Sequence, residues 1–195
     1  MHEIALYAEE GFPPRFRYRI CTVEMTGEGV LLREAGLLLP GKTAELMLRE
    51  APKAALVLCT LGLGFDTALR SAQARDMARA VMLDACGSAL VEAGCDQAEE
   101  ALRSLFPGAY LTDRFSPGYG DLPLNVQPGL LSALDAQRRL GVYVTDGCLM
   151  NPSKSVTAVI GLCEKPQRAR IRGCAFCALR GDCVYRKRGT ECEKI

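Results

Sequence analysis

The residues best suited to bind a small molecule surround a turn at positions 113–123, DRFSPGYGDLP. Arg114 offers a planar guanidinium that pairs with a carboxylate or a phosphate. Tyr119 offers a flat aromatic face and a hydroxyl group. Gly118 and Gly120 carry no side chain, so a ligand can approach the backbone amides and carbonyls closely. Pro-Gly pairs usually form plain surface turns, but the arginine and the tyrosine beside this one favour a binding site.

The histidine and cysteine contents limit the chemistry further. The chain has ten cysteines but a single histidine, His2, beside the N-terminus. Catalysis that relies on histidine is therefore not expected. The first residues lack the basic and apolar regions of a signal peptide, and no apolar run reaches the length of a membrane span. We expect a cytoplasmic protein whose thiols are reduced or bind metal.

Charge and cysteine density divide the chain at residue 164. The net charge is only +1 over the 195 residues. The last segment holds nine Lys and Arg against four Asp and Glu, so it carries +5 and the rest carries −4. We therefore expect a globular body, residues 1–163, followed by a small basic tail, residues 164–195. The tail contains Cys174, Cys177, Cys183 and Cys192.

The hydrophobic pattern of the body predicts an α+β fold, in which helices pack on a mixed or antiparallel twisted sheet. Strands are expected at residues 17–25, 54–60, 142–146 and 155–162, and helices at 43–50, 66–91, 96–106 and 128–140. Asp66 is expected to cap the second helix, and Gly94 lies beyond its expected end. Asp96 and Glu99 fit a capping box for the third helix.

Residues 36–43, GLLLPGKT, match the phosphate-loop pattern G-x-x-x-x-G-K-[ST] letter for letter. That pattern needs an apolar strand immediately before it and an aspartate at the end of a later strand. Here residues 26–35 make a poor strand, and the apolar segment 54–60 ends without an aspartate. Nucleotide binding is therefore disfavoured. Gly41 and Thr43 are instead expected to begin a helix, with Thr43 as its N-cap.

A second loop, TDGCLMNPSKS at 145–155, resembles the first in its glycine, proline and basic residue. The two loops, with a helix between them, resemble the activation domain of cobalamin-dependent methionine synthase. The Arg-x-x-x-Gly-Tyr motif of that family corresponds to Arg114 through Tyr119. Its P-x-x-S-V-S strand corresponds to the segment that begins at Asn151. The resemblance is strong over residues 100–162 and weaker back towards residue 54.

The resemblance implies a role in repairing an oxidised corrinoid. In the family, the activation domain holds S-adenosylmethionine above cob(II)alamin while an electron donor, such as flavodoxin or ferredoxin, reduces the cobalt. Methyl transfer then returns the cofactor to its cycle, and no histidine is needed. The expected partner is the corrinoid-binding domain or subunit of methionine synthase, since this chain lacks the Asp-x-His-x-x-Gly signature. We expect a stand-alone reactivation subunit of this methyltransferase system in methionine biosynthesis, not catalytic alone.

The resemblance also implies a ligand site. Arg114 pairs with the carboxylate of S-adenosylmethionine, Ser116 and Gly118 contribute backbone hydrogen bonds, and Tyr119 packs against the ligand and the corrin. An acidic side chain should balance the ligand ammonium. The sequence leaves four candidates open: Glu99, Glu100, Asp113 and Asp121.

Two other functions follow from the tail. The chain could be a metal- or iron–sulfur-binding redox or regulatory protein that acts on another corrinoid protein, with the body as a scaffold. Binding of S-adenosylmethionine by a truncated chain without the tail would discriminate against this alternative. Nucleic-acid binding through the basic tail is disfavoured, because Phe176 and Tyr185 are its only aromatic residues.

The tail itself predicts a metal site. The Cys-x-x-Cys pair formed by Cys174 and Cys177 lets two thiolates converge on one ion, and Cys183 and Cys192 lie within reach. A 32-residue tail with few large apolar residues can scarcely fold on a core of its own, so a metal would order it. We expect anaerobically purified protein to carry Zn²⁺ or an iron–sulfur cluster, measured by elemental analysis and visible absorption. Less than about a tenth of an equivalent of metal, with four freely titrating thiols, would contradict the site.

Overall fold

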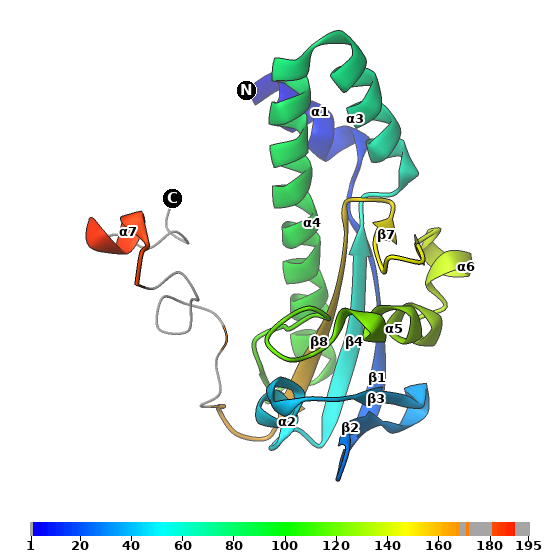
Figure 1. Ribbon diagram of the computed structural model, residues 1–195, viewed down its shortest axis with the longest axis vertical. Helices are drawn as coiled ribbons and strands as arrows, with labels where there is room; N and C mark the ends of the chain where they lie inside the picture. Colours follow the sequence, from blue (N-terminus) through cyan, green and yellow to red (C-terminus); the bar gives the residue numbers. More distant parts are fainter. Residues whose placement is uncertain (1, 168–170, 172–180, 190–195) are drawn as a thin grey trace.

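The computed structural model describes residues 2–167, 171 and 181–189. Six strands form one antiparallel sheet, in the order β3-β2-β1-β4-β8-β5. The strands are β1 Arg15–Thr26, β2 Gly29–Leu32, β3 Leu37–Leu39, β4 Lys53–Thr60, β5 Tyr110–Leu111 and β8 Ser155–Cys163. The α+β class with an antiparallel sheet is therefore confirmed (Figure 1).

Strand β4 is the centre of the sheet. It pairs with β1 on one side, where Arg15 lies opposite Thr60, and with β8 on the other, where Ser155 lies opposite Thr60. All of its residues after Lys53 are buried, because helices cover both faces of the sheet at this strand. A continuous apolar run in the sequence is typical of such a doubly covered strand.

The long α4 (Met77–Leu105) covers one face of the sheet, and α1 (His2–Gly11) and α3 (Leu63–Arg75) pack against α4 and the end of β4. Figure 1 shows α4 running along the sheet and past its upper end. Gly94 lies where α4 approaches the sheet closely, since a Cβ there would be 2.4 Å from the Cys59 sulfur. Small residues in the middle of this helix thus allow the close packing.

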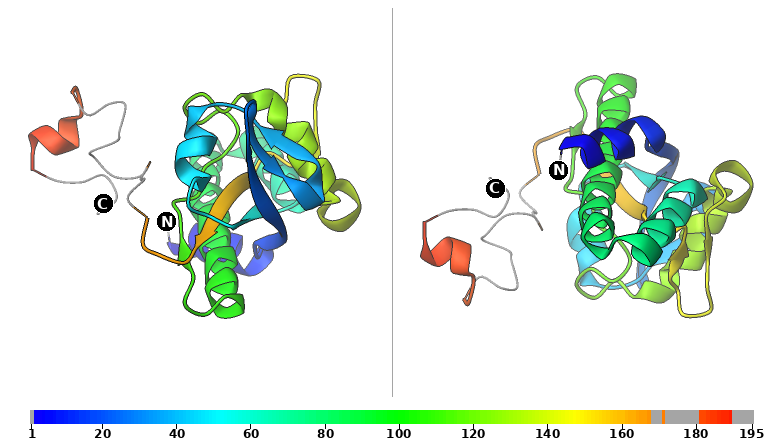
Figure 2. Two further views of the ribbon diagram at one scale, coloured as in Figure 1. Left: turned by 90° about the horizontal axis from the view of Figure 1, so that it is seen from below. Right: turned by 90° about the horizontal axis from the view of Figure 1, so that it is seen from above.

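The other face is covered by α2 (Lys42–Leu48), α5 (Gln127–Ala133) and α6 (Ala136–Leu140). The end-on views in Figure 2 show α4 and these helices on opposite sides of the sheet. The core between the sheet and α2, α5 and α6 is built from large side chains that are fully buried: Leu32, Leu39, Met47, Leu56, Leu58, Phe115 and Leu130.

Arginines of β1 connect the sheet to α5 and α6. Arg17 Nε donates to the carbonyl of Leu134 at 2.8 Å, and Arg19 Nη1 donates to the carbonyl of Ala133 at 2.9 Å. Arg15 reaches the end of α6 in the same way. The last carbonyls of a helix lack partners within the helix and carry partial negative charge, so guanidinium groups stabilise these helix ends.

The remaining elements are short. Strands β6 (Tyr143–Val144) and β7 (Met150–Asn151) form a separate antiparallel hairpin. Single turns of 3-10 helix occupy Arg33–Ala35 and Leu124–Val126, and α7 spans Val184–Lys187. None of the helices in the described ranges combines the length and the apolar character that a membrane crossing requires.

Several predicted helix boundaries were wrong. The expected helix at 66–91 is two helices, because the extended backbone of Asp76 interrupts it. Asp76 Oδ1 accepts from the Arg79 amide and so caps α4. Asp66 caps nothing and lies in the first turn of α3. Gly94 ends no helix, since α4 continues through the segment that the supposed capping box of Asp96 was to begin.

Other differences concern short or irregular segments. Thr43 is not the N-cap of α2, because Gly41 occupies that position. The predicted helix at 128–140 is interrupted by Asp135, which has a left-handed backbone (φ 53°), although it ends at Gly141 as expected. The three leucines of the phosphate-loop pattern form β3 rather than a loop.

Candidate functional site

The segment that carries the Arg-x-x-x-Gly-Tyr motif runs along the outer edge of β8. Tyr110 and Leu111 pair with the end of β8 as β5. Further on, the amide of Phe115 donates to the carbonyl of Val159 at 3.1 Å, and the reverse bond is 2.7 Å. Neighbouring side chains of an extended segment point to opposite faces. Phe115 is therefore buried in the core, while Arg114 points towards α4.

Arg114 binds three carboxylates of α4. Its Nη2 lies 2.6 Å from Glu92 Oε2, and its Nη1 lies 2.6 Å from Asp96 Oδ1 and 2.7 Å from Glu99 Oε1. The acids are spaced four and three residues apart, which places them on one face of the helix. The Arg114 side chain is only 9% exposed, whereas Glu92 and Asp96 are 55% and 67% exposed.

This cluster keeps the guanidinium charged and leaves an excess of acid. Burial acts to lower the pKa of Arg114, but its hydrogen bonds to Asp96 and Glu92 and the charge of Glu99 outweigh burial and raise that pKa above its ordinary value. Arg103 also pairs with Glu99 and with the neighbouring Glu100. Four carboxylates thus face two guanidiniums, and the surplus negative charge suits a cationic ligand group.

The turn after Arg114 is closed by its own backbone. The amide of Gly118 donates to the carbonyl of Leu122 at 2.8 Å, and the amide of Tyr119 donates to the carbonyl of Ser116 at 3.0 Å. Gly118 and Gly120 have φ angles of 93° and 56°, which other residues rarely adopt. Leu122 is buried beneath the turn, and Tyr119 is 52% exposed above it.

A chain of hydrogen bonds joins this turn to the second loop. Ser116 Oγ donates to the carbonyl of Thr157 at 2.6 Å. The amide of the buried Gln127 side chain contacts Thr157 Oγ1 at 2.8 Å and Met150 Sδ at 3.0 Å. The two loops that the sequence singled out are therefore linked through Thr157 of β8 and Gln127 of α5, two residues that the sequence did not identify.

The second loop is bonded to side chains of α3 and α4. Asp66 accepts hydrogen bonds from the amide and the hydroxyl of Ser153, at 2.9 and 2.8 Å. Lys154 Nζ lies 2.9 Å from Asp84 Oδ1 and 2.9 Å from Ser88 Oγ, both on α4. The buried Oδ1 of Asn151 has no hydrogen-bond partner among the described residues.

The four acids proposed to balance a ligand ammonium have different partners in the structure. Glu99 belongs to the Arg114 cluster, and Glu100 is paired with Arg103. Asp113 accepts from the amide of Ile171 at 3.0 Å. Asp121 binds the first amides of α2. Among these four, the structure shows Glu99 in contact with Arg114.

Asp121 stays ionised over the neutral pH range. The Thr43 side chain, followed by the amides of Thr43 and Lys42, lowers the pKa of Asp121 to about 2. A depressed carboxyl pKa contributes stability above the ordinary value near 3.8, and this contribution is lost as the pH falls through about 2.

The tail cysteines are only partly described. Cys174, Cys177 and Cys192 lie outside the described residues, and Cys183 is half-buried immediately before α7. Within the described ranges, no three His, Cys, Asp or Glu residues come together in a way that would hold a metal ion. The metal site, the division at residue 164 and the redox alternative therefore remain predictions.

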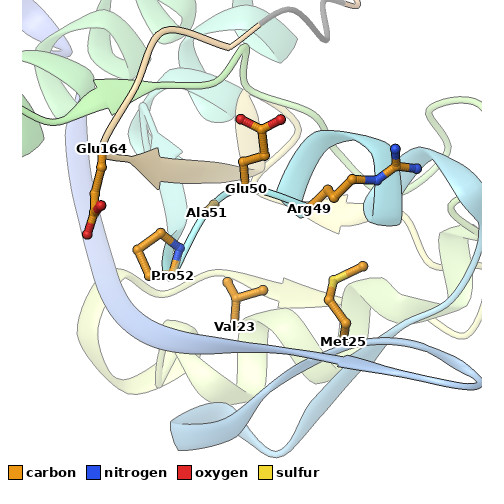
Figure 3. A pocket seen from close by; sticks show the side chains of 7 residues that line it. All are labelled: Val23, Met25, Arg49, Glu50, Ala51, Pro52 and Glu164. Atoms are coloured by element: carbon orange, nitrogen blue, oxygen red, sulfur yellow. The ribbon is translucent and has the colours of Figure 1, made fainter.

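A shallow hollow of about 340 Å³ lies at the end of β8, where the tail begins (Figure 3). One arginine and two glutamates line it together with four apolar residues. The lining residues are Val23, Met25, Arg49, Glu50, Ala51, Pro52 and Glu164. Because the Arg114 segment contributes nothing to this lining, the hollow and the motif are separate features.

The burial of Arg114 predicts its effect on stability. Replacing Arg114 by Ala removes its charge-assisted hydrogen bonds to Glu92, Asp96 and the mostly buried Glu99, although Glu99 keeps its pair with Arg103. We expect the free energy of unfolding in urea to fall by about 1.5–3 kcal/mol. Arg138→Ala is the control, because its pair with Asp135 is exposed and should contribute less. Equal losses for the two variants would contradict the structural role of the cluster.

The sequence matches no family model and no curated protein. The fold, in contrast, matches solved structures, among them the "Crystal Structure of the MetH Reactivation Domain bound to AdoHcy". That superposition has a TM-score of 0.68 at 17% sequence identity, and it covers 97% of this chain and 70% of that chain. The chain therefore has the fold of the MetH reactivation domain, as expected from the motifs at Arg114 and Asn151.

Proposed function

We propose that this protein binds S-adenosylmethionine and supports the reactivation of an oxidised corrinoid held by a partner, as part of cobalamin-dependent methionine synthase. The observation that carries the proposal is the hydrogen-bond link between the two motif loops through Thr157 and Gln127, in a chain with the fold of a reactivation domain. The solved neighbour was crystallised with AdoHcy, the product that remains when S-adenosylmethionine loses its methyl group.

The proposed site consists of Arg114, Ser116, Gly118 and Tyr119. A guanidinium is the natural partner of the ligand carboxylate. Both Nη atoms of Arg114 already contact α4 acids, so a ligand carboxylate would displace one of them. Asp96 suits this exchange, since it is 67% exposed and can swing into water. The displaced carboxylate then remains close by to balance the ligand ammonium and sulfonium.

The proposed reaction needs no acid or base from this chain. An electron donor protein supplies one electron, which converts cob(II)alamin to cob(I)alamin on the partner. Cobalt then attacks the methyl carbon of the sulfonium, the carbon–sulfur bond breaks, and methylcobalamin and S-adenosylhomocysteine form. The role of this chain is to hold the methyl donor in place, which contributes to rate through proximity and orientation.

Ligand binding is the first test. We expect calorimetry to detect S-adenosylmethionine binding at micromolar to millimolar concentration. Arg114→Ala should weaken binding about tenfold to a hundredfold, the equivalent of about 1.5–3 kcal/mol. The titration should be run well below the unfolding temperature of both proteins, with Arg138→Ala as a control of unchanged affinity. Failure of the wild type to bind would reject the proposed function, and equal affinities would reject the role of Arg114.

Corrinoid reactivation is the second test. Added to a separate corrinoid protein in the cob(II) state, with a reductant and S-adenosylmethionine, the chain should speed the appearance of methylcobalamin, followed by visible absorption. The isolated chain should not make methionine from homocysteine. Turnover of homocysteine by the chain alone would show that it is not an accessory subunit.

A further inference from the structure

Residues 36–43, which match the phosphate-loop pattern, bind a carboxylate from the chain itself. The first amides of α2, at Lys42 and Thr43, are the groups that such a loop would offer to a phosphate. In the structure they donate instead to the carboxylate of Asp121, at 2.7 and 2.8 Å. Asp121 lies 79 and 78 residues away from them in the sequence, in the turn that follows the Arg-x-x-x-Gly-Tyr motif.

The two segments fit each other through their glycines. A Cβ at Gly41 would lie 2.8 Å from the Asp121 carboxylate, and a Cβ at Gly120 would lie 2.3 Å from Thr43 Oγ1. Both glycines also have positive φ angles, 98° and 56°. A reciprocal bond of 3.4 Å runs from the Asp121 amide to Thr43 Oγ1. Side chains at either glycine would therefore separate α2 from the turn.

The bonds of Asp121 to α2 hold the turn that carries the exposed Tyr119. The turn has backbone bonds of its own between Ser116 and Leu122, and these close it without attaching it to α2. Asp121 lies next to the buried Leu122 and two residues after the half-exposed Tyr119. Its bonds to Lys42 and Thr43 tie the turn to a helix that packs on the core, so they set where Tyr119 stands.

We propose that Asp121 is a positioning residue for the ligand site, which orients the Gly118–Tyr119 turn by binding the N-terminus of α2 rather than by contacting the ligand. The inference rests on the proposed function for its effect on binding. It also assigns a role to residues 36–43, because the same loop chemistry that would cradle a phosphate holds a carboxylate of the chain itself.

The experiment compares two helix-capping aspartates. Asp121→Ala removes the contact between the turn and α2, and the control Asp76→Ala removes the exposed cap of α4, where Asp76 Oδ1 accepts from an amide at 3.1 Å. Both variants lose a carboxylate that accepts from amides in the first turn of a helix, but only Asp121 adjoins the motif. Calorimetry with S-adenosylhomocysteine should show at least about tenfold weaker binding for Asp121→Ala and unchanged affinity for Asp76→Ala. Asp121→Asn, which keeps one acceptor for an amide, should recover part of the affinity.

Amide hydrogen exchange provides a readout that needs no ligand. Asp121→Ala should speed exchange at Gly118 and Leu122, whose amides close the turn, whereas Asp76→Ala should not. Unchanged exchange there would overturn the inference, as would equal affinities of wild type and Asp121→Ala, or an equal loss in Asp76→Ala. If the wild type binds no ligand but exchange responds as expected, the proposed function fails and the positioning contact stands.

Discussion

The need to cover the edge of β8 that faces away from β4 is the constraint on which the site depends. β8 is buried almost throughout, and an uncovered edge would leave its backbone groups without partners in an apolar setting. The segment from Tyr110 to Ser116 covers that edge, and its pairing with Val159 sets which side chain faces which way. A shift of one residue would exchange Phe115 and Arg114, which would bury a guanidinium in the core and expose a large ring. The position of the motif thus follows from the need to cover a strand.

The long strands at the centre of the sheet could be predicted, because the hydrophobic pattern of each one is complete within its own segment. The apolar run that became β4 and the alternation that became β1 are strong local signals. The segments α1, β2 and β3 were missed, because their patterns are short or interrupted by charge. The break at Asp76 was missed since the helical spacing continues on both sides of it, and only a backbone turn separates α3 from α4.

The candidate site shows a similar limit. Arg114 and Tyr119 could be singled out by residue type alone, and a motif gave them a context. Glu92 and Asp96 belong to the site only because α4 crosses behind the β8 edge, a tertiary fact that the sequence does not state. Their spacing with Glu99 on one helical face was visible, but such acidic stripes are usually solvated. Gln127 and Thr157 carry no local signal, since their roles come from hydrogen bonds between side chains that are 30 residues apart in the sequence.

The central position of β4 has a consequence for synthesis on the ribosome. β4 is complete when residue 60 has been made, but its second neighbour ends only at Cys163. During the intervening synthesis, an apolar strand pairs with β1 on one edge and exposes the other, which is the kind of edge that recruits foreign strands. The long α4 emerges in this interval and can shield one face of the strand, although not its edge. Pairing of β8 with β4 must therefore be a late and non-local event of folding, and the candidate site forms only when it occurs.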